Sequence, residues 1–219
     1  LNGRKELPWK VSDPYKIWIS EIMLQQTQVK TVIPYYLKFI DKYPDIKSLS
    51  DAKLDDLMLI WSGLGYYRRV KNIYLSAQII SKKFENNFPN QYNDILSLPG
   101  IGRTTASAIS TFSGFSNMAI LDGNVKRVLT RFFNKTKYNS SSKFENELWE
   151  KSISVTPIEN TASFNQAMMD IGSLICTRNK PSCFSCPLKK IGCLYNPDEA
   201  KHQLKKKDIH NVNMNLLVL

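Results

Sequence analysis

Apolar residues recur three and four positions apart along most of the chain, which is the spacing of helices that bury one face. The strict alternation of apolar and polar residues that indicates strands is almost absent. The spacing predicts helices over 14–28, 31–43, 52–61, 67–84, 91–98, 103–113, 123–133, 143–155 and 161–175. The fold class is therefore expected to be all-α.

Capping residues and glycines divide these helical stretches. Ser, Thr and Asp side chains favour helix N-termini, whereas glycine favours the residue after a helix. We expect helix starts at Asp13-Pro14, Ser50 and Ser142, and helix ends at Gly63-x-Gly65 and Gly114.

The charge balance indicates a polyanionic partner. Among 219 residues, 30 Lys and Arg face 19 Asp and Glu, giving a net charge of +11 that is spread along the chain. Nucleic acid rewards such a charge through counterion release, although a basic composition can also be incidental. No stretch approaches the roughly 18 apolar residues that span a bilayer, so we expect no membrane-embedded segment.

All four cysteines fall in one short segment with the spacing C-x6-C-x2-C-x6-C: Cys176, Cys183, Cys186 and Cys193. Thiolates select zinc or an iron–sulfur cluster, and four of them suit either. A pair of disulfides is the alternative. It is disfavoured, because a chain of 219 residues is long enough not to need covalent staples for stability. The spacing therefore predicts a metal site.

A short glycine loop separates two of the predicted helices, in the sequence Leu98-Pro99-Gly100-Ile101-Gly102. Glycines leave backbone N–H groups open, and with the following helix N-terminus they can bind a phosphate. The plain alternative is that Gly100 and Gly102 only close a helical hairpin. The pattern is similar to the helix-hairpin-helix of DNA repair proteins, which binds the DNA backbone without reading sequence.

Several motifs in the same order make the resemblance more specific. From about Leu7 to Cys193 the chain resembles the MutY-type adenine DNA glycosylases of the helix-hairpin-helix superfamily. The motifs that carry it, besides the hairpin and the cysteines, are Ser20-Glu21-Ile22-Met23-Leu24-Gln25-Gln26-Thr27-Gln28-Val29, Ile120-Leu-Asp-Gly-Asn-Val-Lys-Arg-Val128 and Phe164-Asn-Gln-Ala-Met-Met-Asp170.

The resemblance implies two lobes with DNA in the cleft between them. Residues 12–117 would form a six-helix barrel, and 1–11 with 118–197 a lobe that holds a 4Fe-4S cluster on the four cysteines. Residues 198–219 would be a linker and the start of a truncated C-terminal domain, related to Nudix hydrolases, that recognises 8-oxoguanine in family members. Members usually have five residues before the last cysteine, whereas six precede Cys193.

The resemblance also assigns the chemistry to two carboxylates. Glu21 would be the general acid that protonates adenine N7, because burial would raise its pKa above the ordinary value of about 4.3. Asp122 would stabilise the cationic sugar, although its type and position also suit a helix cap. Thr104 stands where the related endonuclease III enzymes carry a Schiff-base lysine, which favours a monofunctional enzyme.

Contacts to DNA follow from the same resemblance. Gln26 and Tyr66 would insert into the duplex near the orphaned base. Trp9, Asn124 and Gln166 would line the pocket for adenine and its sugar. Basic side chains would face phosphates or, alternatively, lie on a solvated helix face: Arg68, Arg69, Lys126 and Arg127.

The expected function is base excision repair of adenine mispaired with 8-oxoguanine or guanine in double-stranded DNA, leaving an abasic site. The protein would act as a monomer, in the cytoplasm at the nucleoid if the cell is bacterial. Two alternatives stay open: an endonuclease III-like glycosylase and lyase for oxidised pyrimidines, and a non-catalytic, metal-stabilised DNA-binding module.

Overall fold

The computed structural model describes residues 7–134 and 142–197, and within these ranges every regular element is a helix. The prediction of an all-α fold is confirmed. The α-helices are α1 (Pro14–Leu24), α2 (Val29–Lys42), α3 (Ile46–Ser50), α4 (Leu54–Trp61), α5 (Arg68–Phe84), α6 (Tyr92–Leu96), α7 (Arg103–Phe112), α8 (Gly123–Phe132), α9 (Ser142–Val155), α10 (Thr161–Asp170) and α11 (Pro187–Lys190). A π-helical turn covers Ile171–Ile175 and a 3-10 turn covers Cys183–Ser185.

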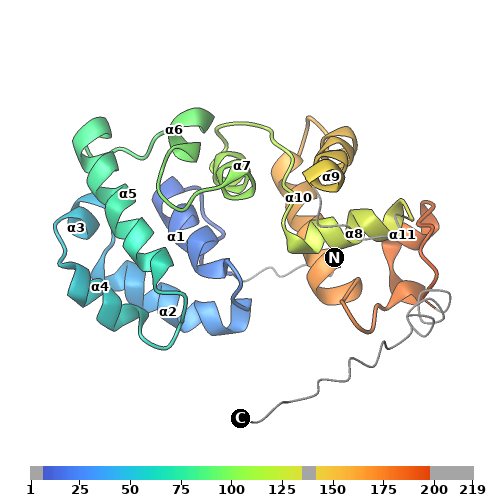
Figure 1. Ribbon diagram of the computed structural model, residues 1–219, viewed down its shortest axis with the longest axis horizontal. Coiled ribbons are helices and arrows are strands. Elements are labelled where there is room, and N and C mark those ends of the chain that lie inside the picture. Colours follow the sequence, from blue (N-terminus) through green and yellow to red (C-terminus); the bar gives the residue numbers. More distant parts are fainter. Residues whose placement is uncertain (1–6, 135–141, 198–219) are drawn as a thin grey trace, which may run out of the picture.

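The helices gather into two groups, each with its own apolar core. Figure 1 shows α1 to α7 on one side and α8 to α11 on the other. The first core takes its buried side chains from Trp9 to Ile109, and the second takes them from Leu121 to Met168. α7 belongs to the first core and also packs against α10. The junction between the groups is therefore made by α7 and by the segment that follows it.

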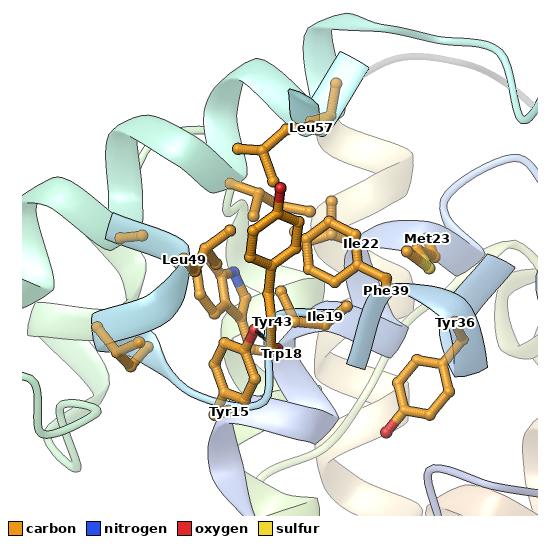
Figure 2. Close-up of a cluster of buried hydrophobic side chains, with 14 of the residues drawn as sticks. Tyr15, Trp18, Ile19, Ile22, Met23, Tyr36, Phe39, Tyr43, Leu49 and Leu57 are labelled. Atoms are coloured by element: carbon orange, nitrogen blue, oxygen red, sulfur yellow. Dashed lines mark hydrogen bonds between the residues drawn. The ribbon is translucent and has the colours of Figure 1, made fainter. Parts of the chain in front are cut away.

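Aromatic residues fill the first core, as Figure 2 shows. Phe39 is fully buried, and its ring centroid lies 5.4 Å from that of Tyr43 and 6.2 Å from that of Trp61. The Tyr15 hydroxyl donates a hydrogen bond of 2.6 Å to the Tyr43 carbonyl oxygen, so this polar atom is satisfied inside the core. The packing fixes α1, which carries Glu21.

Several predicted helix boundaries are confirmed. The Asp13 carboxylate accepts hydrogen bonds from the backbone N–H groups of Tyr15 and Lys16 and so caps α1. Gly63, Gly65 and Gly114 all have positive φ, a conformation that ends a helix at little cost only for glycine.

Two boundaries were predicted wrongly. α1 ends at Leu24, four residues early, because Gln26 adopts φ 58° and breaks the helical path. Ser50 caps no helix; it is the last residue of α3, a short helix that the spacing did not reveal. The cap of α3 is Asp45, whose carboxylate accepts a 2.7 Å hydrogen bond from the Ser48 backbone N–H.

The predicted helix over 161–175 is α-helical only to Asp170 and continues as the π-helical turn. Gly172 in this turn lies against α8: a Cβ atom there would be 2.6 Å from the Asn124 Cβ and 2.9 Å from the Asn124 carbonyl oxygen. Only glycine therefore lets the turn approach the helix that follows Asp122. None of the helices in the described ranges is long and apolar enough to cross a membrane.

Phe39→Ala should lower the free energy of unfolding by about 3–5 kcal/mol, because it removes a fully buried ring from a packed core. Leu37→Ala on the same helix should change it by less than about 0.5 kcal/mol, because Leu37 is 53% exposed. Urea unfolding of both variants measures the difference. Equal effects would contradict the assignment of Phe39 to the core.

Candidate active site

Glu21 lies near the C-terminal end of α1, partly buried and flanked by the buried residues Ser20 and Ile22. Burial, and after it the negative charge of Asp122, raise the pKa of its carboxyl group from 4.5 to about 7. A carboxyl group in this state carries a proton for about half of the time at neutral pH. The two carboxyl groups come from different helix groups, and Asp122 is near enough for its charge to act on Glu21.

Asp122 caps α8, as its position predicted. One carboxylate oxygen accepts a 2.7 Å hydrogen bond from the Val125 backbone N–H, and the other accepts a 3.0 Å bond from the Asn124 side-chain amide. Both oxygens are held, so the carboxylate has one orientation. The helix N-terminus also favours negative charge at this position.

Thr104 lies in the first turn of α7 and contacts the residue that precedes Asp122. Its hydroxyl donates a 3.1 Å hydrogen bond to the carbonyl oxygen of Leu121. α7 in turn packs against α1. The segment that carries Asp122 is therefore bound to α7, and α7 packs against α1, which carries Glu21.

The two glycines of the hairpin play different structural parts. Gly100 has φ +78°, and a Cβ atom there would lie 2.4 Å from the side-chain nitrogen of Asn72. Gly102 is the N-terminal cap of α7, has an ordinary φ of −97°, and has open space within 4 Å of where a Cβ would be. The fold requires Gly100, whereas Gly102 is exposed at the N-terminus of α7.

Gln26 and Tyr66 share an unusual backbone conformation. Both have positive φ, 58° and 51°, although neither is glycine. Both side chains are exposed, Tyr66 to 59%. The structure therefore presents both at the surface, as their predicted role in DNA requires.

Arg69 does not face solvent, so the prediction that it faces phosphates is wrong. Its side chain is 6% exposed. The guanidinium donates to the backbone carbonyl oxygens of Ile22, Met23, Gln25, Leu64 and Gly65. The sequence held a signal for this burial: Arg69 precedes Ile73 by four positions and Ala77 by eight, which places it on the apolar face of α5.

Arg127 was also expected at phosphates and instead points into the protein. It donates to the Cys176 carbonyl oxygen at 2.8 Å, the Gly172 carbonyl oxygen at 2.6 Å and the Asn124 side-chain oxygen at 2.8 Å. A continuous chain of hydrogen bonds thus joins the Asp122 carboxylate, through Asn124 and Arg127, to the first cysteine. Its neighbour Lys126 forms an ion pair of 2.6 Å with Glu145.

The remaining predicted pocket residues lie in different surroundings. Trp9 is 8% exposed in the first core, with its ring centroid 5.3 Å from that of Tyr36. The Gln166 amide donates a 3.0 Å hydrogen bond to the Asp170 carboxylate. Of these three residues, Asn124 hydrogen-bonds to a predicted catalytic residue, Asp122. The pocket roles of Trp9 and Gln166 stay predictions.

The four cysteines are free and line one pocket at the end of the second helix group. Burial, and then the negative charges of the other three cysteines, raise the pKa of Cys183. Arg131 reaches into the same pocket and donates to the Cys176 sulfur at 3.2 Å while lying over the Tyr195 ring. Four cysteine side chains that line one pocket can supply the sulfur ligands of a metal ion or cluster.

Within the described residues, no group of three or more His, Cys, Asp or Glu side chains is placed to hold a single metal ion. The chemistry of four thiol donors fits either zinc or a 4Fe-4S cluster.

The additional residue before Cys193 is accommodated in a turn. α11 ends at Lys190, and Gly192 adopts φ +101°. The Cys193 backbone N–H then donates a 3.0 Å hydrogen bond to the Leu188 carbonyl oxygen. Cys193 consequently lines the same pocket as the other three cysteines.

Comparison with known proteins places this arrangement in a family. A family model described as an HhH-GPD superfamily base excision DNA repair protein matches residues 19–152, which is more than half of the chain. The chain belongs to the HhH-GPD superfamily. The matched region contains Glu21, the hairpin and Asp122.

Relatives within the HhH-GPD superfamily carry a common name. The chain is 57% identical over 190 residues to the adenine DNA glycosylase of Buchnera aphidicola subsp. Acyrthosiphon pisum, covering 86% of this chain and 54% of the relative. It is 51% identical over 209 residues to that of Buchnera aphidicola subsp. Schizaphis graminum, covering 94% and 60%. The chain thus spans little more than half the length of these relatives.

Among solved structures, the fold resembles that of a thermostable thymine-DNA glycosylase. The TM-score is 0.78 at 28% sequence identity, and the match covers 89% of both chains. The arrangement of both helix groups is therefore shared with a glycosylase.

Glu21→Gln should stabilise the protein at pH 8. Because folding raises the pKa of Glu21, the folded protein keeps a proton that the unfolded chain releases, and stability falls as the pH rises from about 4.5 to about 7. A pKa change of this size corresponds to about 3 kcal/mol. Glutamine cannot ionise, so the variant avoids this loss.

Urea unfolding at several pH values measures the effect. The stability difference between Glu21→Gln and the parent should grow across this pH window and then level off. Glu150→Gln, at an exposed position of α9, is the matched control and should show no such growth. A difference that is independent of pH would contradict the assigned pKa.

Proposed function

We propose that this chain hydrolyses the N-glycosidic bond of adenine mispaired with guanine or 8-oxoguanine in double-stranded DNA, leaving an abasic site. The observation that carries the proposal is the pair formed by Glu21, with a pKa of about 7, and the helix-capping Asp122. Membership of the HhH-GPD superfamily and the name shared by the relatives support it.

Glu21 is the general acid in this proposal. Adenine leaves the sugar readily only when its ring nitrogen N7 is protonated, because the base then departs as a neutral molecule. A carboxyl group with a pKa near the working pH both holds the proton and gives it up, and such catalysis is typically worth about 10²–10⁴-fold. Partial burial and the nearby charge of Asp122 supply the required pKa.

Asp122 acts on the sugar. As the C1′–N bond breaks, positive charge develops on the sugar ring, as in glycoside hydrolysis. The two hydrogen bonds from Val125 and Asn124 hold the Asp122 carboxylate in one place. There it stabilises the cation, or forms a transient bond to C1′ that breaks when water attacks. The water adds its hydroxyl to C1′, and its proton passes to solvent.

Thr104 limits the reaction to hydrolysis. Its hydroxyl is held by the Leu121 carbonyl oxygen and has no amine with which to form a Schiff base. The strand is therefore left uncut at the abasic site. This argument disfavours the endonuclease III-like alternative, in which a lysine at this position cleaves the strand.

DNA binding is proposed along the junction of two lobes, residues 12–117 and residues 1–11 with 118–197. Backbone N–H groups at the exposed Gly102 would bind a phosphate, as helix N-termini do. The exposed Gln26 and Tyr66 would enter the duplex to stabilise the flipped adenine. Trp9, Asn124 and Gln166 complete the proposed pocket. The proposed linker, residues 198–219, lies outside the described residues.

We further propose that Cys176, Cys183, Cys186 and Cys193 bind a 4Fe-4S cluster. The pocket that the four cysteines share supports a bound metal group. The resemblance to MutY-type glycosylases, which carry a 4Fe-4S cluster at these positions, favours a cluster over zinc. When bound, the cluster holds the loop of residues 176–193 in shape. Exposed basic side chains on this loop then face the DNA backbone: Arg178, Lys180, Lys189 and Lys190.

Glu21→Gln should reduce the single-turnover rate of adenine release by about 10²–10⁴-fold, because it removes the proton donor. Duplexes with adenine opposite guanine or opposite 8-oxoguanine are the substrates, and Glu150→Gln should match the parent. The strand should break only after treatment with alkali. Full activity of Glu21→Gln, release of an oxidised pyrimidine by the parent, or no release from any duplex would each reject the proposed reaction.

Purified anaerobically, the protein should contain iron and acid-labile sulfide in equal amounts, four of each, and show the visible absorbance of a 4Fe-4S cluster. Cys193→Ala should lose most of both, because the fourth ligand is gone. Lys190→Ala, beside the same turn, should retain them. Stoichiometric zinc without iron would contradict the cluster.

A further inference from the structure

We propose that Arg69 is a positioning residue that sets the backbone conformation of Gln26 and Tyr66 together. The inference rests on the proposed function, in which these two residues enter the duplex. Nothing in the reaction itself involves Arg69, which is buried away from the surface.

Arg69 hydrogen-bonds to the two peptide groups that precede Gln26 and Tyr66. One guanidinium nitrogen donates a 2.7 Å hydrogen bond to the Gln25 carbonyl oxygen, and the other donates a 3.1 Å bond to the Gly65 carbonyl oxygen. These carbonyls belong to the peptide groups immediately before Gln26 and Tyr66. Since the orientation of a peptide plane helps to set the φ of the following residue, Arg69 constrains φ at both positions.

Both positions need such a constraint. Gln26 and Tyr66 adopt the left-handed conformation, which costs a non-glycine residue on the order of 1–3 kcal/mol and persists only when the surroundings hold it. At Tyr66, further contacts constrain the backbone conformation. The Trp61 ring nitrogen donates to the Gly65 carbonyl oxygen at 3.0 Å, and the guanidinium lies 5.3 Å from the Tyr66 ring centroid.

Only arginine can make this connection. The guanidinium is a rigid plane with donors on two arms. One arm binds the Met23 and Gln25 carbonyl oxygens at the end of α1, both at 2.7 Å, while the other reaches the loop before α5. A lysine ammonium is a single point charge and cannot occupy both places. Arginine therefore couples two loops that are about forty residues apart in sequence.

The coupling acts on duplex opening rather than on bond breaking. Unpairing and unstacking a base costs a few kcal/mol, and both inserting residues must be presented at once to offset it. Loss of the coupling should therefore slow excision only where a base pair has to be opened.

Two duplexes separate these steps for the parent and Arg69→Lys. One carries adenine opposite guanine, and the other carries adenine opposite a tetrahydrofuran abasic analogue, where there is no pair to open. We expect Arg69→Lys to slow single-turnover excision at least about tenfold on the first duplex, equivalent to about 1.4 kcal/mol, and less than about threefold on the second. The control Lys82→Arg, exposed on the same helix, should match the parent on both.

Amide hydrogen exchange gives a readout that does not depend on activity. In Arg69→Lys, exchange should rise together in residues 25–28 and 62–67, with the buried helix α7 unchanged. If Arg69→Lys does not fold, Trp61→Phe removes the second donor to Gly65 and should raise exchange in 62–67 alone.

Two results for Arg69→Lys overturn the proposal: equal losses of activity on the two duplexes, or exchange that changes in only one loop or in neither. If the parent releases no adenine opposite guanine, the proposed function fails instead, and the exchange measurement still decides the role of Arg69.

Discussion

The unfavourable burial of one carboxyl group beside another is the constraint on which the site depends. Glu21 is partly removed from water and faces the charge of Asp122, and both effects favour its protonated form. Such an arrangement costs stability at neutral pH, so it persists only because the surrounding packing fixes both residues. The buried face of α1 anchors Glu21, and the cap of α8 anchors Asp122.

Two arginines with inward-pointing side chains, Arg127 and Arg69, connect the site to the rest of the protein. Arg127 connects Asn124, which holds Asp122, to the backbone of Gly172 and Cys176. Arg69 connects the end of α1 to the loop that presents Tyr66. In each case a planar cation satisfies carbonyl oxygens that a tight turn leaves unpaired. The basic composition thus serves the interior as well as any nucleic-acid surface.

The helical spacing of apolar residues predicted most of the fold, because burying one face of each helix is what stabilises it. α3 escaped prediction because five residues are too few to show a period. The early end of α1 escaped because the strain at Gln26 is imposed by contacts with Arg69, far along the chain. Local sequence cannot reveal a conformation that a distant residue maintains.

Some features of the candidate site could likewise be predicted from the local sequence, and others could not. The cap at Asp122 could be predicted from its own neighbourhood, whereas the pairing of Glu21 with Asp122 followed only from the family resemblance. The sequence predicted that Arg69 and Arg127 contact phosphates, because charged side chains are usually exposed. For Arg69 the helical period pointed inward and was the better guide.

The pH dependence of adenine release in single turnover, on a duplex with adenine opposite guanine, tests the central claim most directly. If the protonated form of Glu21 performs the chemistry, the rate should fall about tenfold per pH unit above a midpoint near its pKa of about 7. A rate that stays constant through neutral pH, or a midpoint near the ordinary glutamate value of 4.5, would contradict the account.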